Sequence, residues 1–239
     1  MTLLRLDNVG KSYGGVAALR GVSFTVAAGE IVGLMGANGA GKTTAFSLIA
    51  GTQRPTTGEI WFDGARIDRK PPYAAARLGI ARTFQIVRPF GGLRVIDNLV
   101  VAAMYGHARE RSRSAAEDRA REILSEVGLG RDLDRRAETL TLAGRKRLEI
   151  ARGLMSAPRL LLLDEPSLGL APTVIEQLFP TIVAIARNGV AVCLVEQDVQ
   201  LSLEVADYAY MLENGAIVLE GPARDLLSSE RVRTGYLGL

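Results

Sequence analysis

One eight-residue segment constrains the fold of this chain more than any other. Residues 36–43 read G-A-N-G-A-G-K-T and fit the spacing G-x-x-x-x-G-K-[ST], in which glycines let the backbone turn its N–H groups inward. The apolar run Ile31–Met35 before it predicts a buried strand, and residues 45–49 after it predict a helix. A strand, a glycine-rich turn and a helix in this order predict a phosphate-binding loop.

The residue types in this loop suggest how phosphates would be bound. Lys42 supplies a mobile point charge for β- and γ-phosphates, and Thr43 supplies a hydroxyl for Mg²⁺. The alternative is an ordinary glycine-rich turn with a surface lysine, but lysine is rare in this chain, and Lys42 is one of only four. We therefore expect nucleotide contacts at Gly36, Asn38, Gly39, Ala40, Gly41, Lys42, Thr43 and Thr44.

Composition limits the remaining possibilities. The 239 residues suffice for one large α/β domain or a domain with a subdomain, and 48% are hydrophobic, as in globular proteins. No apolar run is long enough to span a membrane, and the first residues do not resemble a signal peptide, so a cytoplasmic protein is expected. The arginine-rich stretches 109–113 and 131–136 alternate with acidic residues, so we expect solvated helix faces and no nucleic-acid partner.

Hydrophobic patterning predicts a mixed sheet. Residues 160–163 and 190–195 are continuously apolar, which is typical of central parallel strands, and the single cysteine, Cys193, should be packed in the second of them. Alternating patterns predict an antiparallel edge sheet from residues 3–9 and 22–26, shorter strands at 58–62 and 80–84, and a hairpin from 208–212 and 216–220. Residues 88–157 are richer in Arg, Glu and Ala and predict a helical insertion, with Leu124 and Val127 on one helix face.

A second chemical motif follows one of the predicted central strands. Residues 160–165 read L-L-L-L-D-E, which places two carboxylates at the carboxyl end of a buried strand, the edge where open α/β sheets bind ligands. Asp164 could hold Mg²⁺ through water, and Glu165 could polarise a water for attack on the γ-phosphate. Together with the loop, the motif predicts nucleotide hydrolysis.

Together these motifs resemble the nucleotide-binding subunits of ATP-binding-cassette (ABC) transporters over nearly the whole chain. Tyr13 matches the family's adenine-stacking aromatic, and Gln85 in A-R-T-F-Q matches the glutamine that links Mg²⁺ and the attacking water to the membrane subunit. The segments S-L-G-L-A-P after Glu165 and E-N-G-A-I-V-L-E-G-P at 213–222 also fit. The resemblance implies one α/β P-loop NTPase domain over residues 1–239: a core with its antiparallel sheet at about 1–87 and 158–239, and a helical subdomain at about 88–157.

Three strings resemble the ATPases of branched-chain amino-acid importers and their urea and amide relatives. They are G-I-A-R-T-F-Q at 79–85, D-E-P-S-L-G-L-A-P at 164–172 and V-E-Q-D at 195–198. Such importers usually carry two different ATPase subunits, and the front half of this chain is similar to one and the back half to the other. The resemblance implies ATP and Mg²⁺, a second ATPase subunit, membrane permease subunits near Gln85 and residues 87–98, indirectly a substrate-binding protein, and a place on the cytoplasmic face of the membrane.

The chain departs from the family pattern at two places. The signature L-S-G-G-Q, which contacts the γ-phosphate of ATP held by the opposite subunit, is here L-T-L-A-G at 140–144, so Thr141 and Gly144 are the expected contacts and Leu142 and Ala143 should crowd them. The helix after it is expected at 145–154. Gln197 stands at the switch histidine position, where it can hydrogen-bond the γ-phosphate without carrying a positive charge. The weakened signature suggests a heteromeric dimer with unequal sites.

Two other functions stay open at the level of sequence. A soluble ABC ATPase acting on nucleic acid or the ribosome would have the same loop, but such proteins usually contain two cassettes or a long coiled-coil insertion. A regulatory cassette that binds ATP and hardly hydrolyses it would explain Leu142, Ala143 and Gln197, whereas Glu165 argues against it. The sequence does not name the transported substrate, because the resemblance implies that a binding protein and membrane subunits select the cargo.

Overall fold

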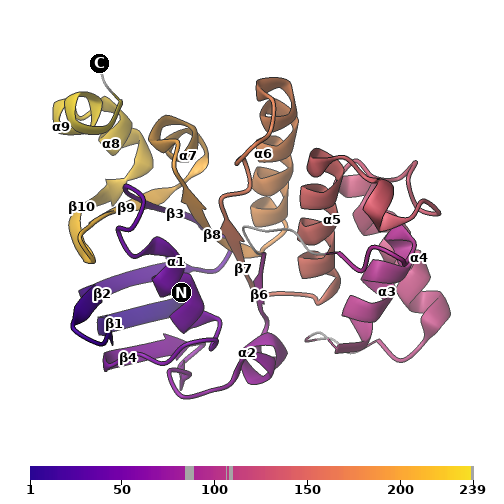
Figure 1. Ribbon diagram of the computed structural model, residues 1–239, viewed down its shortest axis with the longest axis horizontal. Helices are drawn as coiled ribbons and strands as arrows, with labels where there is room; N and C mark the ends of the chain where they lie inside the picture. Colours follow the sequence, from indigo (N-terminus) through magenta and orange to yellow (C-terminus); the bar gives the residue numbers. More distant parts are fainter. Residues whose placement is uncertain (84–88, 106, 108–109, 238–239) are drawn as a thin grey trace.

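The computed structural model describes residues 1–83, 89–105, 107 and 110–237. It contains two β-sheets with helices packed around them, and a group of helices extends to one side (Figure 1). The α/β fold predicted from the sequence, with a mixed sheet, an antiparallel sheet and added helices, is confirmed.

The smaller sheet is antiparallel and has the order β2-β1-β4-β5. Its strands are β1 (Thr2–Tyr13), β2 (Val16–Ala27), β4 (Thr57–Phe62) and β5 (Ala65–Arg66). The first two are longer than the predicted 3–9 and 22–26, because pairing continues to Tyr13 opposite Val16 at a Gly14-Gly15 turn. This extension carries Tyr13 to the end of the hairpin.

The larger sheet has the order β10-β9-β3-β8-β7-β6. The strands β3 (Ile31–Met35), β6 (Ile80–Arg82), β7 (Leu160–Asp164), β8 (Ala191–Glu196) and β9 (Tyr208–Glu213) are parallel, and β10 (Ala216–Pro222) returns antiparallel to β9. Every residue of β3, β7 and β8 is buried, as the continuous apolar runs predicted, and Cys193 is fully enclosed. Parallel pairing puts the carboxyl ends of β3, β7 and β8 at one edge.

Helices surround the larger sheet and form a separate group beyond its β6 edge. The first set is α1 (Lys42–Ile49), α2 (Pro72–Leu78), α6 (Pro172–Arg187), α7 (Val199–Val205), α8 (Ala223–Ser228) and α9 (Glu230–Val232), followed by a π-helical turn, η2 (Arg233–Leu237). The group on the right of Figure 1 is α3 (Val95–Tyr105), α4 (Arg113–Glu126), the short η1 (Ala137–Thr139) and α5 (Leu142–Met155). No helix in the described ranges is long and apolar enough to cross a membrane.

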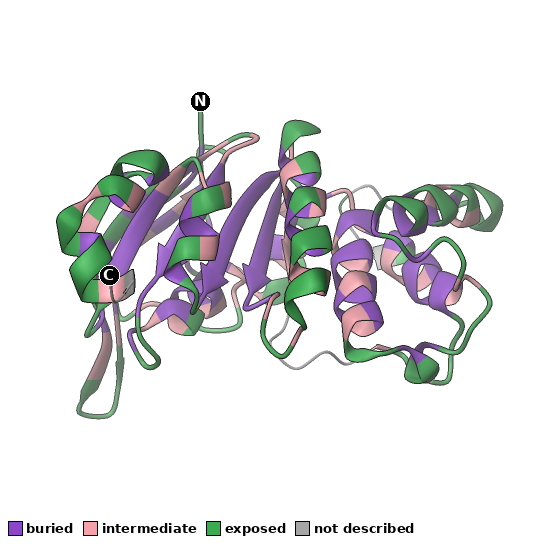
Figure 2. Cartoon of the chain, turned by 90° about the horizontal axis from the view of Figure 1, so that it is seen from above, coloured by how far each residue is buried: buried purple, intermediate pink, exposed green. Residues whose placement is uncertain are grey.

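The larger sheet separates two hydrophobic cores. In β7, Leu161 and Leu163 join the core formed with α3–α6, whereas Leu160 and Leu162 join the core shared with the antiparallel sheet and α1. Figure 2 shows the central strands buried between these layers. Because β3, β7 and β8 each contribute side chains to both cores, the strand ends that carry the polar motifs are held in fixed relative positions.

Candidate functional site

The glycine-rich loop joins β3 to α1 and is held closely against neighbouring backbone. Gly36 has φ 146°, and a Cβ atom there would lie 2.1 Å from the Leu212 carbonyl oxygen. Gly41 has φ 109°, and a Cβ there would lie 2.6 Å from the Ala18 carbonyl oxygen. Both positions therefore require glycine, and the strand, loop and helix occur in the predicted order.

Lys42 is the first residue of α1, and its side chain folds back over the loop. Its Nζ atom donates hydrogen bonds to the carbonyl oxygens of Gly36 at 2.5 Å and Ala37 at 3.0 Å. Burial lowers the pKa of Lys42, and the nearby carboxylates of Glu165, Asp164 and Glu196 oppose this shift. The ammonium group is thus placed at the loop and within electrostatic reach of the carboxylates.

The loop borders an open cavity of about 540 Å³. Asn38 and Gly39 are exposed in it, and Gln197 lies on its wall together with Asn214 and Tyr236 of the C-terminal part of the chain. Thr43 is exposed in the first turn of α1, which has no side-chain cap at its N-terminus. Uncapped N–H groups and the positive end of the helix dipole favour an anion at this position.

Asp164 ends β7, where the sequence predicted a metal carboxylate. Its Oδ2 atom pairs with Arg82 Nη2 at 2.9 Å, and its backbone N–H donates to Thr83 Oγ1 at 3.2 Å. Its other oxygen, Oδ1, is buried and has no hydrogen-bond partner among the described residues. A buried carboxylate oxygen of this kind and the Thr43 hydroxyl are hard oxygen donors, so the residues present fit Mg²⁺.

Glu165, the predicted catalytic carboxylate, follows directly and is buried in an unusual backbone conformation. Its φ of 49° lies in the left-handed region, which costs a non-glycine residue about 1 kcal/mol. Two hydrogen bonds hold it there: its N–H donates to the Val195 carbonyl at 2.9 Å, and its own carbonyl accepts from Lys146 Nζ at 2.7 Å. Lys146 comes from α5, and burial lowers its pKa.

The turn after Glu165 is attached to the end of β8. The Glu196 carboxylate accepts hydrogen bonds from the Ser167 N–H and from the Ser167 hydroxyl, both at 2.7 Å. Burial raises the pKa of Glu196, and the hydrogen bonds from Ser167 and from the Gln197 backbone oppose the shift. The turn and the neighbouring Gln197 therefore share one anchoring carboxylate.

The degenerate signature forms the start of α5. That helix begins at Leu142 rather than at the expected Arg145, because the Thr141 hydroxyl accepts a hydrogen bond from the Gly144 N–H at 3.2 Å and caps it. Thr141 is exposed, Gly144 is buried, and Leu142 is 48% exposed. Leu142 lies beside Gly169, where an added Cβ would be 3.2 Å from its Cδ2 atom.

One further predicted residue, Tyr13, lies outside this cluster, and another, Gln85, belongs to residues that the structure does not describe. Tyr13 is 46% exposed at the end of the β1–β2 hairpin, with the Lys11 ammonium 4.9 Å from its ring centre. The same hairpin reaches the loop, because Ala18 and Leu19 of β2 lie against Gly41. Gln85 lies outside the described residues, so its predicted contacts with metal and water stay a prediction.

Two side chains that contact this cluster were not predicted from the sequence. Arg82 belongs to the string A-R-T-F-Q, and Lys146 is one of the four lysines. Arg82 is a lone cation in a mostly apolar segment, which was a weak local signal, whereas Lys146 stands between Arg145 and Arg147 and gave none. Their carboxylate or carbonyl partners could not be identified without the pairing of β6 with β7 and the position of α5.

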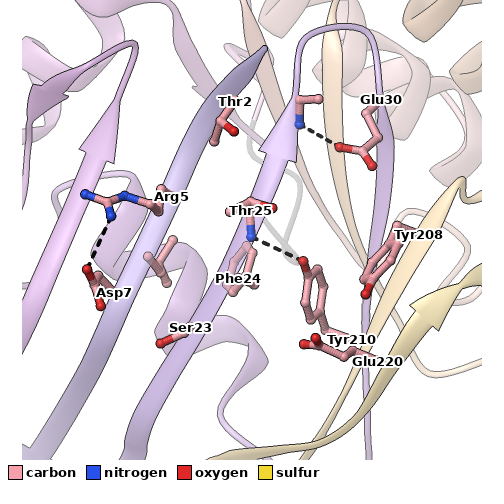
Figure 3. Close-up of a pocket in the computed structure, with 12 residues that line it drawn as sticks. Thr2, Arg5, Asp7, Ser23, Phe24, Thr25, Glu30, Tyr208, Tyr210 and Glu220 are labelled. Atoms are coloured by element: carbon pink, nitrogen blue, oxygen red, sulfur yellow. Dashed lines mark hydrogen bonds and ion pairs between the residues drawn. The ribbon is translucent and has the colours of Figure 1, made fainter.

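A second cavity, of about 650 Å³, lies between the two sheets near the start of β9 (Figure 3). The Tyr208 and Tyr210 rings are 5.1 Å apart in its wall, and the Tyr210 hydroxyl accepts a hydrogen bond from the Thr25 N–H at 3.3 Å. None of the predicted site residues lines it. Residues of the predicted phosphate-binding loop therefore line the loop cavity and not this one.

Comparisons with known proteins agree with this geometry. Residues 19–168 match the sequence profile of the ABC transporter family. The high-affinity branched-chain amino acid transport ATP-binding protein BraG of Pseudomonas aeruginosa is 40% identical over 237 residues, covering 99% of this chain and 100% of the relative. The probable branched-chain amino acid transport ATP-binding protein LivG of Archaeoglobus fulgidus is 34% identical, with 100% and 96% covered.

Solved structures extend the similarity to the fold. The ADP conformation of an ATP-binding cassette of an ABC transporter superposes with a TM-score of 0.88 at 29% identity, covering 100% of both chains. A nucleotide-free cassette superposes with a TM-score of 0.85 at 28% identity, covering 100% of this chain and 96% of the other. From its motifs, its fold and these similarities, the chain belongs to the ABC transporter family of ATP-binding proteins.

Proposed function

We propose that this chain is a Mg²⁺-dependent ATPase subunit that powers import of branched-chain or related amino acids. The observation that carries the proposal is the meeting of Lys42, Asp164 and Glu165 at one edge of the larger sheet, beside an uncapped helix N-terminus. The relatives' names supply the class of cargo, because BraG and LivG are both described as branched-chain amino acid transport ATP-binding proteins.

Each residue of the site would have a distinct part in hydrolysis. The loop N–H groups and Lys42 would bind the β- and γ-phosphates, with Tyr13 stacking on adenine. Glu165 would orient the attacking water and accept its proton, while Gln197 and Gln85 would hydrogen-bond around the γ-phosphate. Thr43 and Asp164, with Gln85, would hold Mg²⁺, which supplies charge neutralisation of the phosphates when bound.

Transport across a membrane would require other subunits beside this chain. A second cassette would place its own 140–144 segment against the ATP bound to this chain, and Thr141 of this chain, which is exposed, would take part in the reciprocal contact. Phe90 and Leu93, 45% and 39% exposed, follow Gln85 in the chain and suit an apolar contact with a permease subunit. A substrate-binding protein would select the cargo, and the subunit would then lie on the cytoplasmic face of the membrane.

The arginine-rich stretches give no support to a nucleic-acid function. Arg113 pairs with Glu117 at 2.9 Å along α4, and Arg136 lies 3.7 Å from Glu138. Arg135 pairs with Asp132 at 2.7 Å. Arginines that face carboxylates on their own helix or turn form mixed-charge surfaces rather than a basic patch for a phosphate backbone.

Binding of ATP to the purified chain tests the proposal. With Mg²⁺, the chain should bind ATP, and Lys42→Ala should weaken binding at least tenfold because the loop loses its mobile cation. Lys70→Ala is the matched control, since Lys70 lies outside the loop cavity, and should bind as wild type does. Failure of the wild type to bind ATP, or equal binding by Lys42→Ala, would refute the proposed site.

A further inference from the structure

Arg82 contacts the proposed metal carboxylate directly, yet the motifs found in the sequence assign it no role. It is the last residue of β6, and its Nη2 atom lies 2.9 Å from Asp164 Oδ2. Its Nη1 atom donates a hydrogen bond to Ser47 Oγ at 3.0 Å, on the helix that begins with Lys42. The Arg82 side chain is 10% exposed and that of Asp164 is 1% exposed, so water screens the pair little.

Buried carboxylates and cations face one another in this region. The carboxylates are Asp164, Glu165 and Glu196, all buried. The cations that face them are Lys42, Lys146 and Arg82. A buried carboxylate without a counter-charge destabilises the folded protein, and Arg82 supplies that counter-charge to Asp164 through Oδ2.

The geometry of the pair leaves a specific atom for a metal ion. Arg82 occupies Oδ2, and Oδ1 is buried without a hydrogen-bond partner among the described residues. The carboxylate is therefore held in one orientation, with one oxygen neutralised and the other available. Because Arg82 already compensates the charge of Asp164, a free divalent cation gains little by approaching unless phosphates bring further negative charge.

We propose that Arg82 is a positioning residue and internal counter-ion for Asp164, which makes binding of the divalent cation depend on bound nucleotide. The inference rests on the proposed Mg²⁺–ATP site. It assigns to Arg82 two effects: the metal-free site stays folded, and Mg²⁺ alone does not occupy it. Removing the positive charge should reverse both.

Thermal unfolding without nucleotide tests this, with MgCl₂ compared against NaCl of equal ionic strength. Wild type should show the same Tm in both salts. Arg82→Gln should melt about 5–10 °C lower in NaCl, because Asp164 becomes an unpaired buried charge, and should recover at least half of that loss in MgCl₂. Arg82→Lys keeps the positive charge, so its Tm should be the same in MgCl₂ and NaCl, as for wild type.

A matched control and a double variant separate charge from shape. Arg66 also pairs with a buried carboxylate, that of Asp68 at 2.6 Å, away from the loop cavity, so Arg66→Gln should gain no Tm from MgCl₂. Arg82→Gln combined with Asp164→Asn should regain stability and lose the response to Mg²⁺. If Arg82→Gln is unfolded in both salts, the double variant must still fold for the proposal to stand.

Several outcomes would overturn the proposal. They are an Arg82→Gln protein that does not respond to MgCl₂, an Arg82→Lys protein that responds as strongly as Arg82→Gln, or a wild type stabilised by MgCl₂ alone. ATP binding by the wild type, measured on the same preparation, is a separate readout. If wild type does not bind ATP, the proposed function is refuted. If wild type binds ATP but the Tm values in MgCl₂ and NaCl do not follow the expected pattern, only the role of Arg82 is refuted.

Discussion

The Lys146 ammonium donates a hydrogen bond of 2.7 Å to the backbone carbonyl of Glu165. Lys146 lies on α5, the helix that begins in the degenerate signature, and Glu165 is the proposed catalytic carboxylate directly after β7. One side chain therefore connects the segment that would contact a partner's ATP with the residue that would activate water in this chain's own site. In a dimer of two cassettes, this contact would give a physical route between the two ATP sites.

Replacing Lys146 should damage catalysis more than ATP binding. Lys146→Met keeps the approximate volume but leaves the Glu165 carbonyl without its Lys146 donor and removes one of the cations near the buried Glu196. We expect a loss of about 2–4 kcal/mol in unfolding free energy and at least a tenfold loss of ATP turnover, with ATP affinity retained. Denaturant unfolding and steady-state assays would measure these, with Lys70→Met as control; full activity in Lys146→Met would refute the link.

Two glycines of the loop should differ sharply when changed to alanine. At Gly36 the new Cβ would meet the Leu212 carbonyl oxygen at 2.1 Å, so Gly36→Ala should cost about 3 kcal/mol or more and abolish ATP binding. At Gly39, with φ 81°, no described atom lies within 4 Å, so Gly39→Ala should cost only about 1 kcal/mol of backbone strain. Chemical denaturation measures the free energy of unfolding of both variants. Equal losses of unfolding free energy would contradict this explanation of the loop.

Much of this site's framework followed from local sequence. The loop, β3 and the carboxylates after β7 were predicted because glycine spacing and continuous apolar runs are local signals. The start of α5 was misplaced because the Thr141 cap competes with the expected signature pattern and begins the helix three residues earlier. The Arg82–Asp164 pair joins residues 82 positions apart, and it depends on which strands are neighbours, which hydrophobic periodicity does not specify.

Restoring glycines to the signature should strengthen contact with a partner's ATP. Leu142 and Ala143 occupy the first turn of α5, where side chains hinder close approach of backbone to phosphate. The double change Leu142→Gly and Ala143→Gly should cost up to about 2 kcal/mol of stability yet increase ATP-driven dimerisation of the Glu165→Gln background. Light scattering with and without ATP measures this. Unchanged or weaker dimerisation would mean that these side chains do not weaken the signature contact.

The C-terminal segment should respond to alkaline pH through Tyr236. Its hydroxyl donates a hydrogen bond to Glu213, and burial with this carboxylate raises the pKa of Tyr236 from its ordinary value near 10 to about 12. A raised pKa means that the bond stabilises the folded state below about pH 10 and that this contribution is lost as pH rises to about 12. Tyr236→Phe should therefore melt below wild type at pH 9, with the difference disappearing near pH 12; a constant difference across this range would exclude the bond.

The most direct measurement of the central claim is steady-state ATP turnover by the purified chain with Mg²⁺, beside Glu165→Gln. The variant keeps the side-chain shape but removes the carboxylate that would accept the water's proton, so turnover should fall at least about 100-fold while ATP binding stays within roughly threefold of wild type. This result would establish a competent site with Glu165 as its catalytic carboxylate. Wild type that binds ATP but turns it over no faster than Glu165→Gln would contradict this assignment.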